Sequence, residues 1–206
     1  MNEAQTERKF KLLTEQANKG YKAFLYDCDG TLANNMEAHK QSYIKVAADH
    51  GLTLQPEIID EFAGLPIPRV VEEINKRYNT TLDPVTFAEL KSELFHNEYI
   101  DRTEPIEFVV EHLKANAGKV KIGVVSGGSR RSIEKTLTVL DILQYVEVLV
   151  CAGETAHGKP YPDPFLAAAE KLGVKPEECV VFEDGDAGVK AAEAAGMKWI
   201  RIDKIG

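Results

Sequence analysis

The sequence lacks the features typical of secreted and membrane-spanning proteins. Its three cysteines, Cys28, Cys151 and Cys179, are odd in number and widely spaced, which favours buried free thiols in a reducing compartment over a disulfide framework. The apolar runs are far too short to cross a bilayer. The first twenty residues are mostly polar and show no signal-peptide pattern. We therefore expect a cytoplasmic protein that has no membrane partner.

Concentrated positive charge is also missing. The formal net charge is -8 at pH 7, and the basic clusters do not extend beyond residues 9–11 and 130–131. Affinity for a phosphate backbone needs a dense Lys/Arg surface, so nucleic acid is not an expected partner. The 206 residues, 44% of them hydrophobic and 28% charged, suit one core or a core with a small inserted domain. We expect a monomer or weak homo-oligomer that acts on a small molecule.

What the sequence does contain is an alternation of short apolar runs with helical patterns. The runs at residues 23–26, 122–125, 146–151, 180–182 and 199–202 are nearly continuous in apolar residues, which is typical of strands buried on both faces of a parallel sheet. Helices are expected between them at residues 132–140, 164–172 and 187–195, the last stopped by Gly196. The fold class predicted is α/β, with a doubly wound parallel sheet.

Residues 36–101 interrupt this alternation. They contain helical patterns broken by glycine and proline, and no strand-like run. We interpret them as a small helical cap domain, inserted after the first strand of a core domain that comprises residues 1–35 and 102–206. Residues 1–20 form an expected amphipathic helix, with Phe10, Leu13 and Ala17 on its apolar face, packed as an extension of the core.

Polar side chains follow four of the expected strands. They are Asp27 and Asp29, then Ser126 and Gly127, then Lys159, and finally Glu183 and Asp184. The carboxyl ends of parallel strands share one edge of the sheet, where ligands bind. Two acids one residue apart in an extended segment project to the same side. Their repulsion calls for a hard cation such as Mg²⁺, while the lysine and hydroxyl can bind an anion, so the set indicates a phosphoryl-transfer site.

The motifs "DCDGT", "VVSGGS", "GKPYPDPF" and "VVFEDGDAGVKAA" resemble, in order and spacing, the four motifs of the haloacid dehalogenase superfamily. The helical insert resembles the cap of its beta-phosphoglucomutase-like subfamily, and the chain looks most like sugar-phosphate phosphatases of that group. The resemblance implies a Rossmann-like core and an Mg²⁺-dependent phosphatase that acts through an aspartyl phosphate. The expected substrate is a small phosphorylated sugar or sugar acid.

The resemblance also implies a role for each matching residue. Asp27 is the expected nucleophile, and Asp29 the general acid and base, whose pKa we expect to be raised by the crowding of acids. Ser126, Gly127 and Lys159 are expected to bind phosphate, and Lys159 is also expected to be catalytic, because it screens Asp27 from the incoming anion. The expected Mg²⁺ ligands are Asp27, Asp184 and the backbone carbonyl of Asp29. Glu183 is expected either to bind the ion itself or to accept hydrogen bonds from groups around the ligands.

In the cap, His39 and Arg69 fall where members of the subfamily carry substrate-facing residues. Relatives have Asp-Ser or Asp-Thr where this chain has Asn34 and Asn35 at the expected hinge. Two alternatives to a phosphatase stay open, a sugar-phosphate mutase and a non-catalytic phosphate-binding module. Mutases of the subfamily place a lysine on the last cap helix. The position that we align with it here is Phe95 or Leu94, with Lys91 about one helical turn earlier, which favours the phosphatase.

Overall fold

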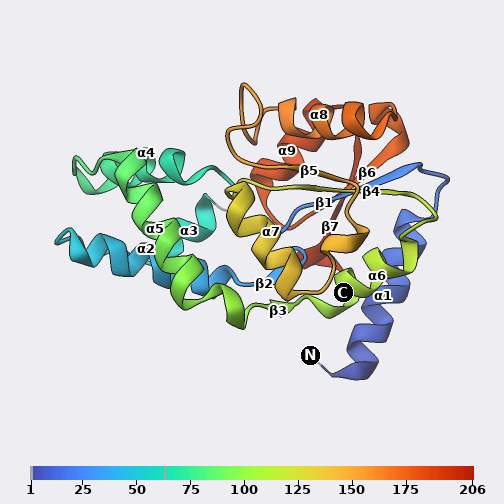
Figure 1. Ribbon diagram of the computed structural model, residues 1–206, viewed down its shortest axis with the longest axis horizontal. Coiled ribbons are helices and arrows are strands. Elements are labelled where there is room, and N and C mark those ends of the chain that lie inside the picture. Colours follow the sequence, from blue (N-terminus) through green and yellow to red (C-terminus); the bar gives the residue numbers. More distant parts are fainter. Residues whose placement is uncertain (1, 63) are drawn as a thin grey trace.

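The computed structural model describes residues 2–62 and 64–206 and is built around a parallel sheet (Figure 1). Its strand order is β5-β4-β1-β6-β7, and every neighbouring pair is parallel. The strands are β1 (Ala23–Tyr26), β4 (Lys121–Val125), β5 (Val148–Val150), β6 (Cys179–Glu183) and β7 (Lys198–Arg201). Because β1 lies in the middle and the chain winds outward on both sides, the loop after β1 opens at the point where strand order reverses.

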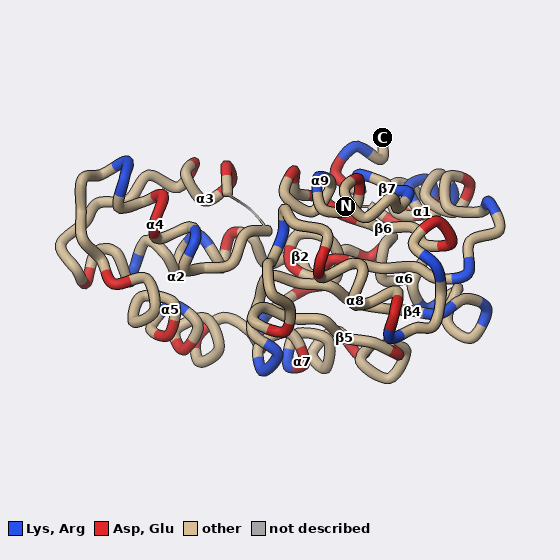
Figure 2. The backbone as a smooth tube through the Cα atoms, turned by 90° about the horizontal axis from the view of Figure 1, so that it is seen from above, with Lys and Arg blue, Asp and Glu red and all other residues tan. Residues whose placement is uncertain are grey.

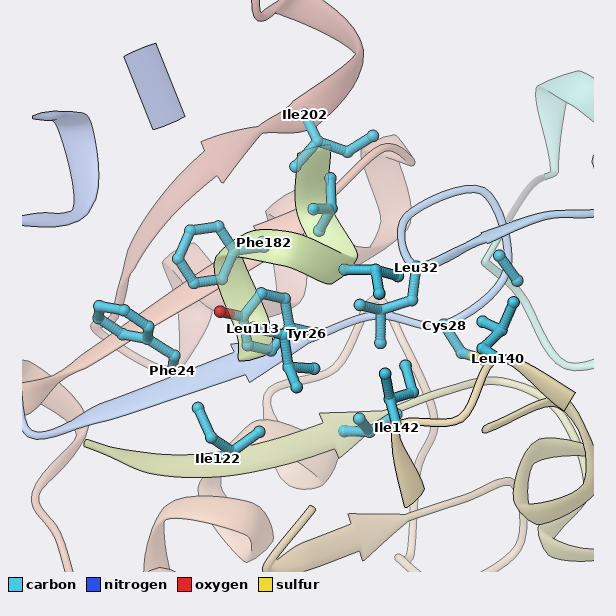
Figure 3. Packing of buried hydrophobic residues seen from close by; sticks show 14 of the residues in the cluster. Phe24, Tyr26, Cys28, Leu32, Leu113, Ile122, Leu140, Ile142, Phe182 and Ile202 are labelled. Carbon is cyan, nitrogen blue, oxygen red and sulfur yellow. The ribbon is translucent and has the colours of Figure 1, made fainter. Parts of the chain in front are cut away.

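Helices cover both faces of the sheet because side chains of each strand alternate between them. Phe24 and Tyr26 of β1 pack in a cluster with α1 (Glu3–Ala17), α6 (Glu107–Asn116) and α7 (Arg130–Val139), part of which is seen in Figure 3. Ala23 and Leu25 point to the opposite face, which is covered by α8 (Asp163–Leu172) and α9 (Asp186–Ala194). The doubly wound sheet predicted from the apolar runs is confirmed.

A group of helices lies apart from the sheet, at the left of Figure 1 and Figure 2. It has its own apolar cluster, which includes Tyr43, Ile59, Val70, Ile74 and Phe87. Its helices are α2 (Met36–Asp49), α3 (Glu57–Glu61), α4 (Ile67–Tyr78) and α5 (Pro84–Glu98), followed by the 3₁₀ turn η1 (Ile100–Arg102). We refer to residues 36–101 as the cap and to the remainder as the core.

Two short strands join the cap to the core. β2 (Ala33–Asn34) pairs with β3 (Glu104–Pro105) in an antiparallel ladder, which brings together the chain segments that enter and leave the cap. These strands were not predicted, because two residues are too few for a periodic pattern. Asn34 therefore lies in a paired strand, and Asn35 is the N-cap residue of α2.

The predicted element bounds agree with the structure to within three residues. Helix α8 begins at Asp163 with Pro162 as its N-cap residue, so the helix start expected at residue 164 was one residue late. Helix α1 packs against α6 through Leu13 and Ala17, as expected. The remaining 3₁₀ turns are η2 (Leu143–Tyr145), η3 (Pro176–Glu178) and η4 (Ile202–Lys204). Within the described residues, no helix is long and apolar enough to span a membrane.

Candidate active site

The loops at the carboxyl ends of the central strands meet below the cap, as the sequence predicted. A cavity there is lined from the core by Asp27, Asp29, Ser126 and Gly127, and from the cap by residues that include His39. Its empty space, which includes the open mouth, is about 580 Å³. Cys28, between the two aspartates, turns into the apolar core.

The buried ammonium of Lys159 donates hydrogen bonds to three groups of the site. Its Nζ donates to Asp27 Oδ1 at 2.6 Å, to Glu183 Oε1 at 2.5 Å and to the carbonyl oxygen of Val125 at 3.0 Å. Burial alone would lower the pKa of Lys159, but the charges of Asp27 and Glu183 outweigh burial and raise it above its usual value. Lys159 is therefore a permanent cation beside the expected nucleophile, where it can neutralise an incoming anion.

Three carboxylates exceed what one lysine can balance. Oxygens of Asp27, Glu183 and Asp184 lie within 4.8 Å of one another. Burial, and then repulsion from Glu183, raise the pKa of Asp184 to about 7, and burial also raises the pKa of Asp27. Such a cluster of hard oxygen donors fits Mg²⁺, which accepts one or two carboxylates together with waters and phosphate oxygens.

The three acids are not equivalent. Glu183 is fully engaged, because Oε1 accepts from Lys159 and Oε2 accepts from the backbone N–H groups of Asp184 and Gly185. Asp184 lies against the turn at Gly30, where an added Cβ would come within 2.3 Å of its Oδ2, and it accepts from the Thr31 hydroxyl at 2.8 Å. The geometry therefore favours Asp27 and Asp184 as metal ligands and Glu183 as the acceptor that orients Lys159.

The cap reaches Asp29. Its Oδ1 accepts from Asn35 Nδ2 at 2.6 Å and lies 3.3 Å from His39 Nε2. Burial raises the pKa of Asp29, but His39, Asn35 and the charge of Lys91 together outweigh burial and lower it to about 2. The expectation of a raised pKa for Asp29 was wrong. The neighbouring acids raise the pKa values of Asp27 and Asp184, whereas Asp29 lies beside Asn35 and His39.

The comparisons with known proteins agree with this geometry. Residues 24–202 match the family model of the haloacid dehalogenase-like hydrolases. The chain belongs to this family. It is 33% identical over 182 residues to fructose-1-phosphate phosphatase YqaB of Escherichia coli, covering 88% of this chain and 96% of that protein. It is 30% identical over 186 residues to the beta-phosphoglucomutase of Bacillus subtilis, covering 85% of this chain and 80% of that protein.

Among solved structures, a hydrolase from Pseudomonas syringae superposes with a TM-score of 0.80 at 19% identity, covering 87% of this chain and 84% of that one. At this identity the likeness shows the fold alone. As a member of the family, the chain is an enzyme of the hydrolase type, and the functional question becomes which ester it cleaves.

The sequence did not predict the contacts that three residues make at the site. Lys91 is 2% exposed and lines the cavity, where its Nζ contacts His39 Nδ1 and burial lowers the pKa of Lys91 to about 8. Phe95 stacks on His39 with ring centroids 4.0 Å apart. The sequence placed Lys91 one turn from the position of the mutase lysine, and nothing in the periodicity of α5 showed that its side chain turns inward. Asn35, the third residue, was expected only at the hinge, and its contact with Asp29 was not predicted.

The structure does not bring Arg69 into the cavity. Arg69 is exposed and pairs with Glu72 at 2.5 Å. It lines a second groove between cap and core, together with His157, Lys159, Tyr161 and Lys190, and this groove shares Phe62 and Leu65 with the cavity. Its role in substrate recognition stays a prediction, whereas His39 and the backbone of Gly64 do line the cavity.

Proposed function

We propose that this protein is an Mg²⁺-dependent phosphatase that hydrolyses a small phosphorylated sugar through an aspartyl-phosphate intermediate. The observation that carries the proposal is that Asp27, which lines the cavity with Ser126, pairs with the buried Lys159 and lies beside the half-buried Asp184. Relatives named as phosphatases of fructose 1-phosphate and of phosphorylated carbohydrates support the substrate class.

In the proposed reaction, Asp27 attacks phosphorus, Lys159 balances the charge, and Ser126 with the backbone of Gly127 binds the phosphoryl oxygens. Asp27 and Asp184 would hold Mg²⁺, which supplies positive charge for the phosphoryl group. Asp29 lies in the same cavity and is assigned the proton transfers, first to the leaving alcohol and then from water. These roles come from matching motifs and from position.

The test is phosphate release from phosphomonoesters with and without Mg²⁺. We expect release that excess EDTA abolishes and that Asp27→Asn removes. Asp49→Asn, which changes an exposed carboxylate at the end of α2, is the matched control and should keep full activity. Mg²⁺ should also raise the melting temperature of the wild type, since a ligand that binds only the folded state stabilises it. Full activity in EDTA or in Asp27→Asn would contradict the proposal.

A mutase is the second candidate, because Lys91 places a cation on the last cap helix inside the cavity. The beta-phosphoglucomutases among the relatives share the same overall arrangement. The expected cytoplasmic location and the monomeric or weakly associating state stay predictions.

A further inference from the structure

Helix α1 forms one wall of a further groove, away from the candidate active site. Residues 24–202 match the family model, so α1 lies outside the matched part of the chain. The helix packs against α6 (Figure 1). The groove lies between the first turns of α1, the start of α6 and the β2–β3 ladder, and it shares no lining residue with the cavity among the described residues. We refer to it as the α1 groove.

Five glutamates line the α1 groove. They are Glu3 and Glu7 of α1, Glu104 of β3, and Glu107 and Glu111 of α6. All five side chains are exposed, and the ion pairs of the described chain involve other residues. No lysine or arginine is present among the described residues that line the groove.

The helix dipole accounts for only part of this charge. Acidic residues stabilise the first turn of a helix, and Glu3 and Glu107 occupy such positions in α1 and α6. Glu7 and Glu111 lie one turn further in, where the effect of the dipole has decayed, and Glu104 lies in a strand. The repulsion among the five carboxylates is therefore not balanced locally, and it favours a cationic ligand.

A buried hydroxyl and apolar side chains accompany the glutamates. Thr6 lines the groove with 9% of its surface exposed, and among the described residues its hydroxyl takes no part in the side-chain hydrogen bonds of α1. A hydroxyl buried in this way lowers its free energy when a ligand supplies a partner, and it can accept from an ammonium group. Phe10, Pro105 and Ile106 are half-buried and add apolar surface to the same groove.

The spacing of the carboxylates favours an extended polycation over a single metal ion. Among the described residues, oxygens of three acids come within 4.8 Å of one another at the active site but not in the α1 groove. The two glutamates of α1, like the two of α6, are four residues apart, which is about 6 Å along a helix axis. The ammonium groups of an aliphatic polyamine are separated by short methylene chains of comparable length, and these chains can pack on apolar side chains.

A basic peptide fits the groove less well than a polyamine does. Carboxylates accept hydrogen bonds but do not donate them, so the backbone carbonyl groups of a bound peptide would find few partners in this groove. A polyamine has no acceptor to satisfy, because each of its charged nitrogens only donates.

We propose that the α1 groove binds a linear aliphatic polyamine, with ammonium groups on the glutamates of α1 and α6 and methylene groups on Phe10 and Ile106. The site does not depend on the proposed phosphatase activity. Because Asn34, Glu104 and Pro105 belong to the ladder that joins the cap to the core, a bound polyamine also contacts both connecting segments.

Isothermal titration calorimetry with spermidine tests the proposal. Excess Mg²⁺ in the buffer competes with spermidine at the acids of the active site. Glu7→Gln/Glu111→Gln should weaken binding by about 3- to 20-fold, because each exposed ion pair contributes a small free energy. Glu15→Gln/Glu177→Gln removes the same charge from exposed positions outside the groove and should bind spermidine like the wild type. Equal weakening in both double variants, or no binding by the wild type, would contradict the proposal.

Hydrogen exchange then locates the bound spermidine. Amide exchange should slow in residues 2–10 and 103–111 of the wild type and should not slow there in Glu7→Gln/Glu111→Gln. Slowing confined to the loop around Asp27 would mean that spermidine binds in the active site and would overturn the assignment. Tighter binding of lysyl-lysine amide, which carries the same charge as spermidine, would also overturn it, because the groove would then be a peptide site.

Discussion

At the scale of the residue, Asp29 is the side chain whose protonation state matters most for the proposed reaction. The cap holds Asp29 as a carboxylate, which suits the activation of water more than the protonation of a leaving alcohol. We expect Asp29→Asn to lower kcat for a sugar phosphate by about 10² to 10⁴, the usual contribution of general acid-base catalysis. The loss in the phosphorylation step should be smaller for p-nitrophenyl phosphate, whose leaving group needs no proton. Wild-type turnover of both esters would make Asp29 merely structural.

His112 supports a prediction about stability at the same scale. Its imidazole is buried beneath the sheet, where Nδ1 pairs with the Tyr26 hydroxyl at 2.9 Å, and burial lowers its pKa from 6.5 to about 4. As pH falls from 6.5 to 4, the unfolded chain binds a proton that the folded protein does not, so stability decreases. The decrease due to His112 should reach about 3 kcal/mol, at about 1.4 kcal/mol for each pKa unit.

Urea unfolding at pH 7 and pH 4.5 measures this contribution. His112→Phe should be less stable than the wild type at pH 7, because the Tyr26 hydroxyl loses its partner, and its stability should depend less steeply on pH. Tyr26→Phe breaks the same hydrogen bond but keeps the imidazole, so it should retain the steeper dependence. The same pH dependence in His112→Phe and the wild type would rule out the buried imidazole as its source.

At the scale of the element, Gly64 and Pro66 of the loop between α3 and α4 contact the core. A Cβ built on Gly127 would come within 2.9 Å of the Gly64 carbonyl oxygen, and one on Gly158 within 3.0 Å of Pro66 Cγ. The backbones of both core loops thus contact the cap directly. Gly158→Ala should push Pro66 away and raise KM about a few-fold, because part of the binding free energy is then spent on closing the cap.

The matched variant for this contact is Pro66→Ala, which removes the ring that the new methyl group would meet. The double variant Gly158→Ala/Pro66→Ala should recover a KM close to that of Pro66→Ala alone, since contacting residues show coupling in a double-mutant cycle. Strictly additive effects on KM would indicate that the methyl group perturbs the Lys159 loop itself and not the cap.

What the sequence predicts well at this scale are the elements with a repeated pattern. The runs around Phe24 and Val181 are buried on both sides, and their periodicity carries that information. The sequence predicts less well which residues form the contacts between loops. Asn35 contacts Asp29 where the chain turns toward the cap, and Lys91 contacts His39 from a different helix. Contacts of this kind leave no periodic signal. The place of Asp27 and Lys159 could be expected because four loops each bring polar residues to the same edge of the sheet, whereas their roles are implied by the resemblance to the family.

At the scale of the whole molecule, the core and the cap contribute different groups to the cavity. The core carries the acids and Lys159 at the end of a rigid sheet, and the cap closes an apolar wall over them. The β2–β3 ladder joins the two connecting segments, so a displacement of the cap would move His39 and Lys91 together relative to Asp29. Binding in the cavity and the environment of Asp29 are therefore coupled through the cap.

The groups that the cap contributes also bear on whether the protein is a phosphatase or a mutase. A mutase must keep its aspartyl phosphate while a bisphosphorylated sugar turns round, so the cap needs a site for a second phosphate. Lys91 is the cation in the cap half of the cavity, but its Nζ contacts His39 and lies 5.0 Å from the Phe95 ring centroid. A lysine committed in this way supports Asp29 and leaves a remote phosphate without a partner. Incubation with beta-glucose 1-phosphate and a catalytic amount of the bisphosphate should therefore yield phosphate and glucose, however slowly. Glucose 6-phosphate accumulating faster than phosphate, and lost in Lys91→Met, would make the mutase the better assignment.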